Sequence, residues 1–253
     1  MVLVHGSAGG LDSWDPVTPF LADEFELWVY ARRGYAPSSS PRGPKTYADD
    51  VADLAAVLAA AGGSAHVVGG SYGATVALRA AAGGLAAIRS VTLFEPPLFA
   101  AGPALAATLE RFRSLLAAGD VAAATRVFAA EVARVPASIL EALAGAGSPG
   151  EAEQAAAVAE ATGSLHDLEA MAADTADIGR WARIDVPVLL MQGSDTWPPM
   201  PATMDALADA LPGAARVVLP GQSHFASHTA PEMFADAVRA FLTDNGSAGV
   251  GWR

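Results

Sequence analysis

A serine among glycines, Gly69-Gly70-Ser71-Tyr72-Gly73, is the segment of the chain best suited to nucleophilic chemistry. It follows an apolar run at residues 65–69 and precedes an alanine-rich stretch, so we expect a strand, a sharp turn and a helix. Such a turn exposes the serine hydroxyl and tolerates only small flanking residues. The helix that begins behind Ser71 offers backbone N–H groups to a developing oxyanion. An ordinary glycine turn with a capping serine is the structural alternative.

A serine hydroxyl attacks only after a neighbouring base takes its proton, so a histidine must lie nearby. The sequence has five histidines, and two of them, His224 and His228, stand between the last expected strand and the last expected helix. That position places them at the same edge of a parallel sheet as Ser71. His224 is nearer to the strand and is the preferred base. The other histidines are expected to have structural roles, in a strand, on a helix surface and in the first glycine turn: His66, His166 and His5.

The elements that must position these residues alternate between strand and helix at both ends of the chain. Apolar runs predict six strands, at residues 1–5, 26–31, 65–69, 90–94, 186–191 and 215–219. Helical spacing predicts helices at residues 46–61, 74–82, 203–211 and 231–242. This alternation predicts an α/β fold, with a mostly parallel sheet of about six strands flanked by helices.

The alternation stops between about residues 100 and 180, where every segment has helical composition. We expect residues 97–180 to form an inserted helical cap on a core made of residues 1–96 and 181–253. Ligands bind at the carboxyl ends of parallel strands, so this block is placed to act as a lid. Four aromatic residues are expected to help line the pocket: Trp14, Tyr72, Phe99 and Trp197.

The composition of the chain excludes several classes of protein. The formal charge of −12 argues against a nucleic-acid partner, because the one notable basic pair is Arg32-Arg33. No apolar run reaches the roughly 18 residues of a membrane span, and no basic-then-apolar leader opens the chain. The chain has no cysteine, which together with the missing leader predicts a cytoplasmic protein. Without cysteine and without an H-E-x-x-H motif, we expect no metal and no cofactor.

Several of these segments together resemble the α/β-hydrolase superfamily. They are the Gly69–Gly73 turn, the His5-Gly6 turn, the Arg32-Arg33-Gly34 loop and the Gly221-x-x-His224 segment followed by Pro231-Glu232. The resemblance covers nearly the whole chain outside the helical block, and the order of nucleophile, acid and histidine agrees. It implies a hydrolase fold with a cap, and an oxyanion hole made by the backbone N–H groups of Ser7 and Tyr72. The usual first two strands of the family have no counterpart before the His5-Gly6 turn.

The resemblance leaves two candidates for the carboxylate that orients the histidine. The commoner family position is Gly-x-x-Asp after the strand at 187–191, but in Gly193-Ser194-Asp195-Thr196 the Asp is one residue early and Thr196 holds its place. Some haloalkane dehalogenases and a zearalenone-lactonase-like group carry the acid after the strand that follows the nucleophile, where this chain has Glu95. A carboxylate at a buried strand end needs a partner, which a histidine N–H supplies. Glu95 is therefore slightly preferred over Asp195.

The sequence thus predicts a cofactor-independent serine hydrolase that cleaves a small or medium carboxylic ester or lactone through an acyl-enzyme. Its expected partner is that small molecule, with no nucleic acid and no membrane, and association into a homo-oligomer stays open. A non-hydrolytic ligand-binding or lyase-type member of the same fold is the alternative. A dinucleotide-binding unit fits poorly, because Ser71 and Ala74 stand where G-x-G-x-x-G requires glycine.

Overall fold

The computed structural model describes residues 1–143 and 151–248. Its centre is a six-stranded sheet with the order β2-β1-β3-β4-β5-β6, in which every neighbouring pair is parallel. The strands are β1 (Val2–Val4), β2 (Trp28–Val29), β3 (Ala65–Gly70), β4 (Ile88–Phe94), β5 (Val188–Gly193) and β6 (Ala215–Leu219). The predicted α/β fold with about six strands is confirmed.

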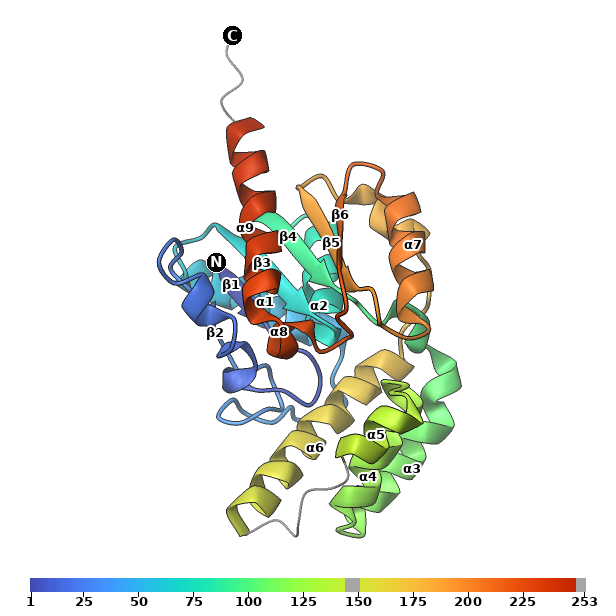
Figure 1. Cartoon of the computed structure of the whole chain (residues 1–253). Coiled ribbons are helices and arrows are strands. Elements are labelled where there is room, and N and C mark those ends of the chain that lie inside the picture. Colours follow the sequence, from blue (N-terminus) through green and yellow to red (C-terminus); the bar gives the residue numbers. More distant parts are fainter. Residues whose placement is uncertain (144–150, 249–253) are drawn as a thin grey trace.

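Two hydrophobic cores lie on opposite faces of this sheet, because successive side chains of a strand point to opposite sides. Val2 and Val4 of β1 pack in the core shared with α1 (Tyr47–Ala60), α2 (Tyr72–Ala82) and α7 (Met200–Ala210). Leu3 packs in the other core, against α9 (Pro231–Ala248) and the segment around Trp14. Figure 1 shows α9 on one side of the sheet, with α1 and α2 on the other.

Local chemistry explains where α1 begins, and topology explains why β2 is short. The backbone N–H of Asp49 donates to the hydroxyl of Thr46, and the Asp49 carboxylate accepts from the backbone N–H of Thr46, so α1 begins at Tyr47. The strand predicted at 26–31 is only Trp28–Val29, because its single neighbour in the sheet is the three-residue β1. At the other end of the chain, α9 continues to Ala248, past the predicted end at residue 242.

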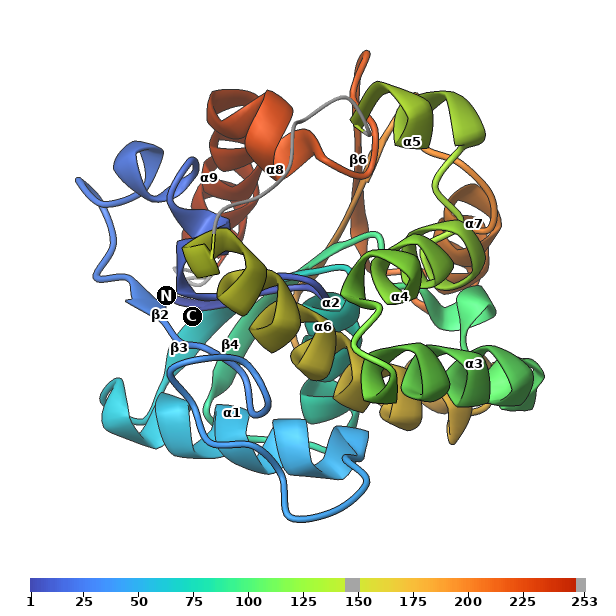
Figure 2. The ribbon, with the colours of Figure 1, turned by 90° about the horizontal axis from the view of Figure 1, so that it is seen from below.

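A helical layer lies beyond the carboxyl ends of the strands (Figure 1). It contains α3 (Ala106–Ala117), α4 (Val121–Val127), a π-helical turn (Phe128–Val132), α5 (Ala137–Leu143) and α6 (Glu151–Ala172). Seen from this side, α4 and α6 lie in front of the sheet (Figure 2). Short 3-10 helices at Leu98–Ala100, Pro103–Leu105 and Gly179–Arg183 connect the layer to the sheet. Within the described residues, every helix is too short or too polar to cross a membrane.

Candidate active site

Ser71 sits at the sharp turn between β3 and α2, with φ 53° and ψ −120°. A non-glycine residue in this region is strained by roughly 1–3 kcal/mol, so the surrounding packing must maintain it. The glycines allow that packing: a Cβ on Gly73 would lie 2.2 Å from the carbonyl oxygen of Val4, and one on Gly69 would lie 2.5 Å from that of Gly73. The backbone N–H of Ser71 donates to the carbonyl of Phe94 at 2.8 Å. The turn is thereby held between β1 and β4.

His224 and Glu95 form a buried pair at the same edge of the sheet. Nδ1 of His224 lies 2.5 Å from Oε2 of Glu95, which follows β4 directly. Glu95 is fully buried, and its carboxylate also accepts hydrogen bonds from the backbone N–H of Gly193 and the hydroxyl of Thr196, both at 2.8 Å. These donors provide the partners that a buried carboxylate requires. Because Nδ1 of His224 is bound to Glu95, the other ring nitrogen, Nε2, remains available to a different partner.

Two aromatic rings hold the His224 imidazole in place. Its centroid lies 6.0 Å from that of Phe94, with the planes nearly parallel, and 5.8 Å from that of Trp197. Trp197 is itself fixed because its Nε1 donates to the carbonyl of Ala133 in the helical layer at 2.9 Å. The side chain of His224 is only 11% exposed. The contacts with Phe94 and Trp197 therefore restrict the orientation of the His224 ring.

Asp195, the alternative acid, is not brought to His224. Its side chain is exposed, and its carboxylate accepts a hydrogen bond from the hydroxyl of its neighbour Ser194 at 2.7 Å. Thr196, which occupies the commoner family position for the acid, instead donates to Glu95. The residue type at 196 was visible in the sequence, but its role as a support for Glu95 was missed. The two acids thus differ in both burial and partner.

Ser71 and His224 line one cavity of about 400 Å³ between the sheet and the helical layer. The sheet side contributes the loop at residues 5–9, the elbow and the loop around His224; the helical layer contributes residues of α4, the π-helical turn and α5. His228, the second histidine considered as the base, also lines the cavity, and its Nδ1 lies 3.1 Å from the hydroxyl of Ser227. In the described part of the chain, no group of three or more histidine or carboxylate side chains could hold a metal ion.

The expectation that four aromatic residues line the pocket is correct for Trp14 only. Tyr72 points away from the cavity, because its hydroxyl donates to the buried carboxylate of Asp50 at 2.8 Å. Trp197 lies behind His224 rather than in the cavity wall, and Phe99 is not part of the wall either. For Tyr72, only the backbone remains available to the site.

The two candidate oxyanion donors flank Ser71. The loop that carries Ser7 lies directly against the elbow, since a Cβ on Gly6 would be 3.1 Å from Cβ of Ser71. Tyr72 follows Ser71 at the start of α2, where backbone N–H groups have no acceptor inside the helix. Within the described residues, neither the N–H of Ser7 nor that of Tyr72 donates to another group of the protein. Both are therefore available to a bound oxygen.

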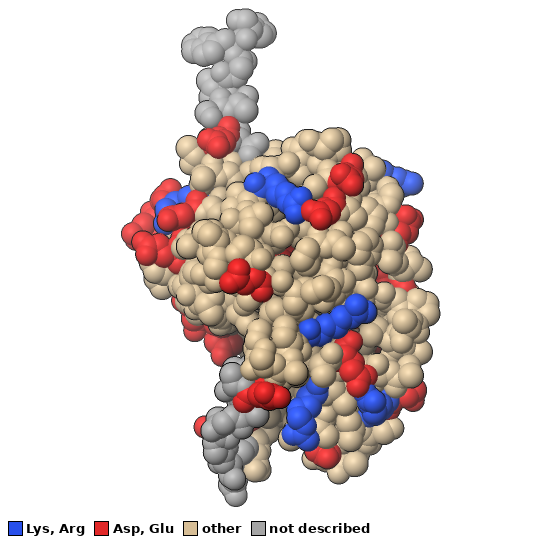
Figure 3. Space-filling view, turned by 45° about the vertical axis from the view of Figure 1, so that its right-hand side comes forward, with Lys and Arg blue, Asp and Glu red and all other residues tan. Residues whose placement is uncertain are grey.

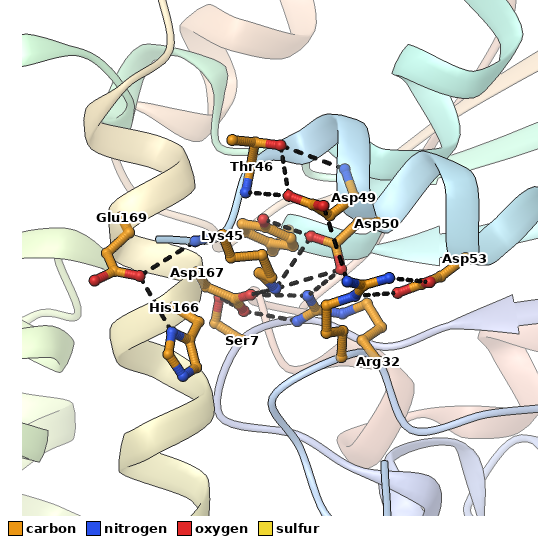
Figure 4. A network of polar contacts seen from close by, with 12 residues as sticks. Ser7, Arg32, Lys45, Thr46, Asp49, Asp50, Asp53, His166, Asp167 and Glu169 are labelled. Atoms are coloured by element: carbon orange, nitrogen blue, oxygen red, sulfur yellow. Dashed lines mark hydrogen bonds and ion pairs between the residues drawn. The ribbon is translucent and has the colours of Figure 1, made fainter. Parts of the chain in front are cut away.

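A buried network of charges supports the loop that carries Ser7 (Figure 4). Asp167 of α6 accepts from the hydroxyl of Ser7 at 2.7 Å, from two nitrogens of Arg32 at 2.8 and 2.6 Å, and from Nζ of Lys45 at 2.5 Å. Arg32 in turn donates to the carbonyls of His5 and Gly6, at 2.8 and 3.0 Å. The network thus joins the helical layer to the backbone of the candidate oxyanion loop.

The charges of this network compensate one another in the interior. Arg32, Lys45, Asp50 and Asp167 are each at most 1% exposed. Burial alone would raise the pKa of Asp167, but the positive charges and hydrogen bonds of Arg32 and Lys45 hold it well below its ordinary value. The sequence did not indicate that Asp167 is buried, because it is one of several acidic residues in an alanine-rich helix. Sequence reasoning therefore missed it.

His5 is a structural part of the same loop. Its Nε2 accepts the backbone N–H of Arg32 at 2.9 Å, and its Nδ1 lies 2.7 Å from the carbonyl oxygen of Gly6, to which it donates. Burial, followed by the positive charge of Arg32, lowers the pKa of His5 to about 3. The imidazole is therefore neutral in the folded protein at physiological pH. The other two histidines also have structural contacts: His66 with Ser90, and a partly buried rather than surface His166 with Glu169.

This lowered pKa makes the stability of the fold depend on pH. An unfolded histidine binds a proton near pH 6.5 while folded His5 does not, so its contribution is complete above that pH and is lost as the pH falls toward 3. We expect His5 alone to lower the free energy of unfolding by up to about 3 kcal/mol between pH 7 and pH 4.5. Urea unfolding followed by circular dichroism at both pH values measures this loss.

The comparison variant is His5→Gln, which cannot take up a proton and should show a smaller loss between the two pH values. His228→Gln removes an exposed histidine and should keep the full loss of the unmodified protein. Equal losses in the unmodified protein and in His5→Gln would show that His5 does not carry the pH dependence.

Comparison with known proteins agrees with this geometry. The model of the "Alpha/beta hydrolase family" matches residues 1–237. The chain is similar to a crystal structure of an alpha/beta hydrolase from Sphaerobacter thermophilus, with 32% identity, a TM-score of 0.82, and 95% of this chain and 91% of the other covered. It is 26% identical to the 2-(acetamidomethylene)succinate hydrolase of Mesorhizobium japonicum over 96% of this chain and 87% of the relative. The enol-lactonase of Burkholderia xenovorans shares the fold, with 23% identity, a TM-score of 0.73, and 96% and 90% coverage.

Proposed function

The chain belongs to the alpha/beta hydrolase family, a family of enzymes, and we propose that it is a serine hydrolase that cleaves a small or medium carboxylic ester or lactone. The single observation that carries this proposal is the buried pair of Glu95 and His224, which opens on the same cavity as the Ser71 elbow. A nucleophile, a base and an orienting carboxylate are the parts that acyl transfer through a serine needs.

In the proposed mechanism, Nε2 of His224 takes the proton of the Ser71 hydroxyl as its oxygen attacks the carbonyl carbon. The carbonyl oxygen becomes negatively charged and accepts hydrogen bonds from the N–H groups of Ser7 and Tyr72. The tetrahedral intermediate then expels the alkoxide, which receives the proton from His224, and an acyl-enzyme remains. Water attacks this ester with His224 again as the base, which releases the carboxylic acid and restores Ser71. Glu95 stabilises the imidazolium in both steps.

We also propose that residues 97–180 act as a cap on the core of residues 1–96 and 181–253. Residues of α4, the π-helical turn and α5 form one wall of the cavity, so the block controls what reaches Ser71. The name of the Mesorhizobium relative is that of a hydrolase, which supports hydrolysis over the ligand-binding and lyase-type alternatives. The choice of ester or lactone rests on the serine chemistry.

Rapid mixing with p-nitrophenyl acetate tests the acyl-enzyme. We expect a burst of nitrophenolate close to one equivalent per chain where deacylation is the slower step, and an added acetyl group on the intact protein after an acid quench. Ser227→Ala removes another serine of the cavity wall and should keep the adduct. Failure of the folded protein to cleave or to become acetylated would favour a non-hydrolytic member of the fold.

A further inference from the structure

The cavity wall beside the proposed catalytic groups is apolar. Its aromatic and aliphatic members come from both the sheet side and the helical layer: Trp14, Phe94, Phe128, Val132, Leu140 and Phe225. Its polar members are hydroxyls and imidazoles, including those of Ser13, Thr125 and His228. A wall of this kind favours groups that lose little by leaving water.

No lysine, arginine, aspartate or glutamate belongs to this wall, as far as the described residues form it. Residues 144–150, outside the described part, read Ala-Gly-Ala-Gly-Ser-Pro-Gly and carry no charge either. Arg126 and Arg134 are next to wall residues in the chain, but both side chains are exposed and neither lines the cavity. A substrate carboxylate in the cavity would therefore meet no cationic side chain among the wall residues that the structure describes.

The buried cations of the network are not free to serve this purpose. Arg32 is fully buried and bound to Asp167 through two hydrogen bonds, and Lys45 contacts both Asp167 and Asp50. Releasing either one to a ligand would leave two buried carboxylates, Asp50 and Asp167, with one cation between them, which is unfavourable in the interior. On the face that Figure 3 shows, basic side chains lie singly and mostly beside acidic ones, without a basic patch.

The chain as a whole is negatively charged, but acidic side chains do not line the described part of the cavity wall. Asp12 is adjacent in the chain to the wall residue Ser13, and like Arg126 and Arg134 it is exposed and does not line the cavity. Glu160 of α6, which is exposed, lies within electrostatic range of Asp12. The formal charge of −12 on the whole chain disfavours the approach of anions.

We propose that the substrate is an uncharged, largely apolar ester or lactone, and that the enzyme discriminates against acyl groups that carry a carboxylate. This inference rests on the proposed function and names its substrate class. A carboxylate that enters an apolar wall loses its hydration and gains no partner, whereas an alkyl chain of the same length gains by burial.

Two esters with the same leaving group test the inference: p-nitrophenyl valerate and mono-p-nitrophenyl glutarate, whose acyl chains differ by a terminal methyl or carboxylate. At pH 8 we expect kcat/KM for the valerate to be higher by about 100-fold or more. The methyl ester of the glutarate controls for size and should be cleaved like the valerate. Because local desolvation causes the difference, most of it should persist in 0.5 M salt.

Equal or faster cleavage of the glutarate would overturn the inference but leave the proposed function intact. If neither ester is cleaved and Ser71 is not acylated, the proposed function fails instead. If the glutarate is cleaved well and Arg134→Gln abolishes this, Arg134 reaches the cavity and the inference is again wrong.

A charge added to the wall provides a second test. Thr125→Arg places a cation in the lining on α4, while Ala122→Arg adds the same charge to an exposed position on the same helix that does not line the cavity. We expect Thr125→Arg to shift the ratio of kcat/KM toward the glutarate by about tenfold, and Ala122→Arg to leave that ratio unchanged. An equal shift in both variants would show that long-range charge, and not the wall, sets the preference.

Discussion

Replacing Ser71 with alanine is expected to lower kcat for ester hydrolysis by at least about 10⁴-fold, because no acyl-enzyme can form. Binding should change little, so KM for any residual activity should stay within a few-fold. The hydroxyl makes no hydrogen bond to another described residue, and the turn is held by backbone contacts and by the glycines. The variant should therefore fold normally, which its circular dichroism spectrum and melting temperature will show.

The matched control is Ser227→Ala, which removes a second hydroxyl from the same cavity. It should retain kcat within about tenfold, since His228, the histidine beside that hydroxyl, is exposed and no carboxylate of the described residues holds it as Glu95 holds His224. Comparable losses in both variants would mean that the serines act on binding rather than as nucleophiles. Unchanged activity in Ser71→Ala would contradict the proposed mechanism directly.

Replacing Glu95 with glutamine should lower kcat by about 10³- to 10⁴-fold, whereas Asp195→Asn should change it by less than about threefold. Glutamine keeps the size of the side chain but loses the charge that stabilises the imidazolium. Its single oxygen can replace only one of the two carboxylate oxygens, which accept separately from Gly193 and from Thr196. Asp195 is exposed and contacts its neighbour Ser194, so its charge is screened by solvent. Steady-state kinetics of both variants on one ester measures the difference.

A positioning role predicts that the loss in Glu95→Gln appears in kcat far more than in KM. Acylation of Ser71 should slow in parallel, which stopped-flow mixing will show. The melting temperature of each variant separates this effect from a loss of fold. A larger loss of kcat in Asp195→Asn than in Glu95→Gln would reverse the assignment of the acid.

The nucleophile turn and the sheet could be predicted because both leave local patterns in the sequence. A glycine-flanked serine between an apolar run and an alanine-rich run has few other conformations, and parallel strands bring their carboxyl ends to one edge. The position of Glu95 at the end of β4 made it a candidate before any geometry was known. The family and the α/β fold followed from these features.

The buried network could not be predicted, because its members are far apart in the chain. Asp167 is 135 residues from Arg32 and 122 from Lys45. In a single sequence, an acid in an alanine-rich helix looks the same whether it faces solvent or the interior. The direction of the Tyr72 side chain could not be predicted either, because its hydroxyl donates to Asp50, which belongs to another helix.

Labelling with a fluorophosphonate probe, followed by mapping of the modified peptide, tests the central claim most directly. The account predicts one adduct per chain, located on Ser71, absent in Ser71→Ala and formed much more slowly in His224→Ala. A folded protein that stays unlabelled, or one labelled on a different serine, would contradict the account.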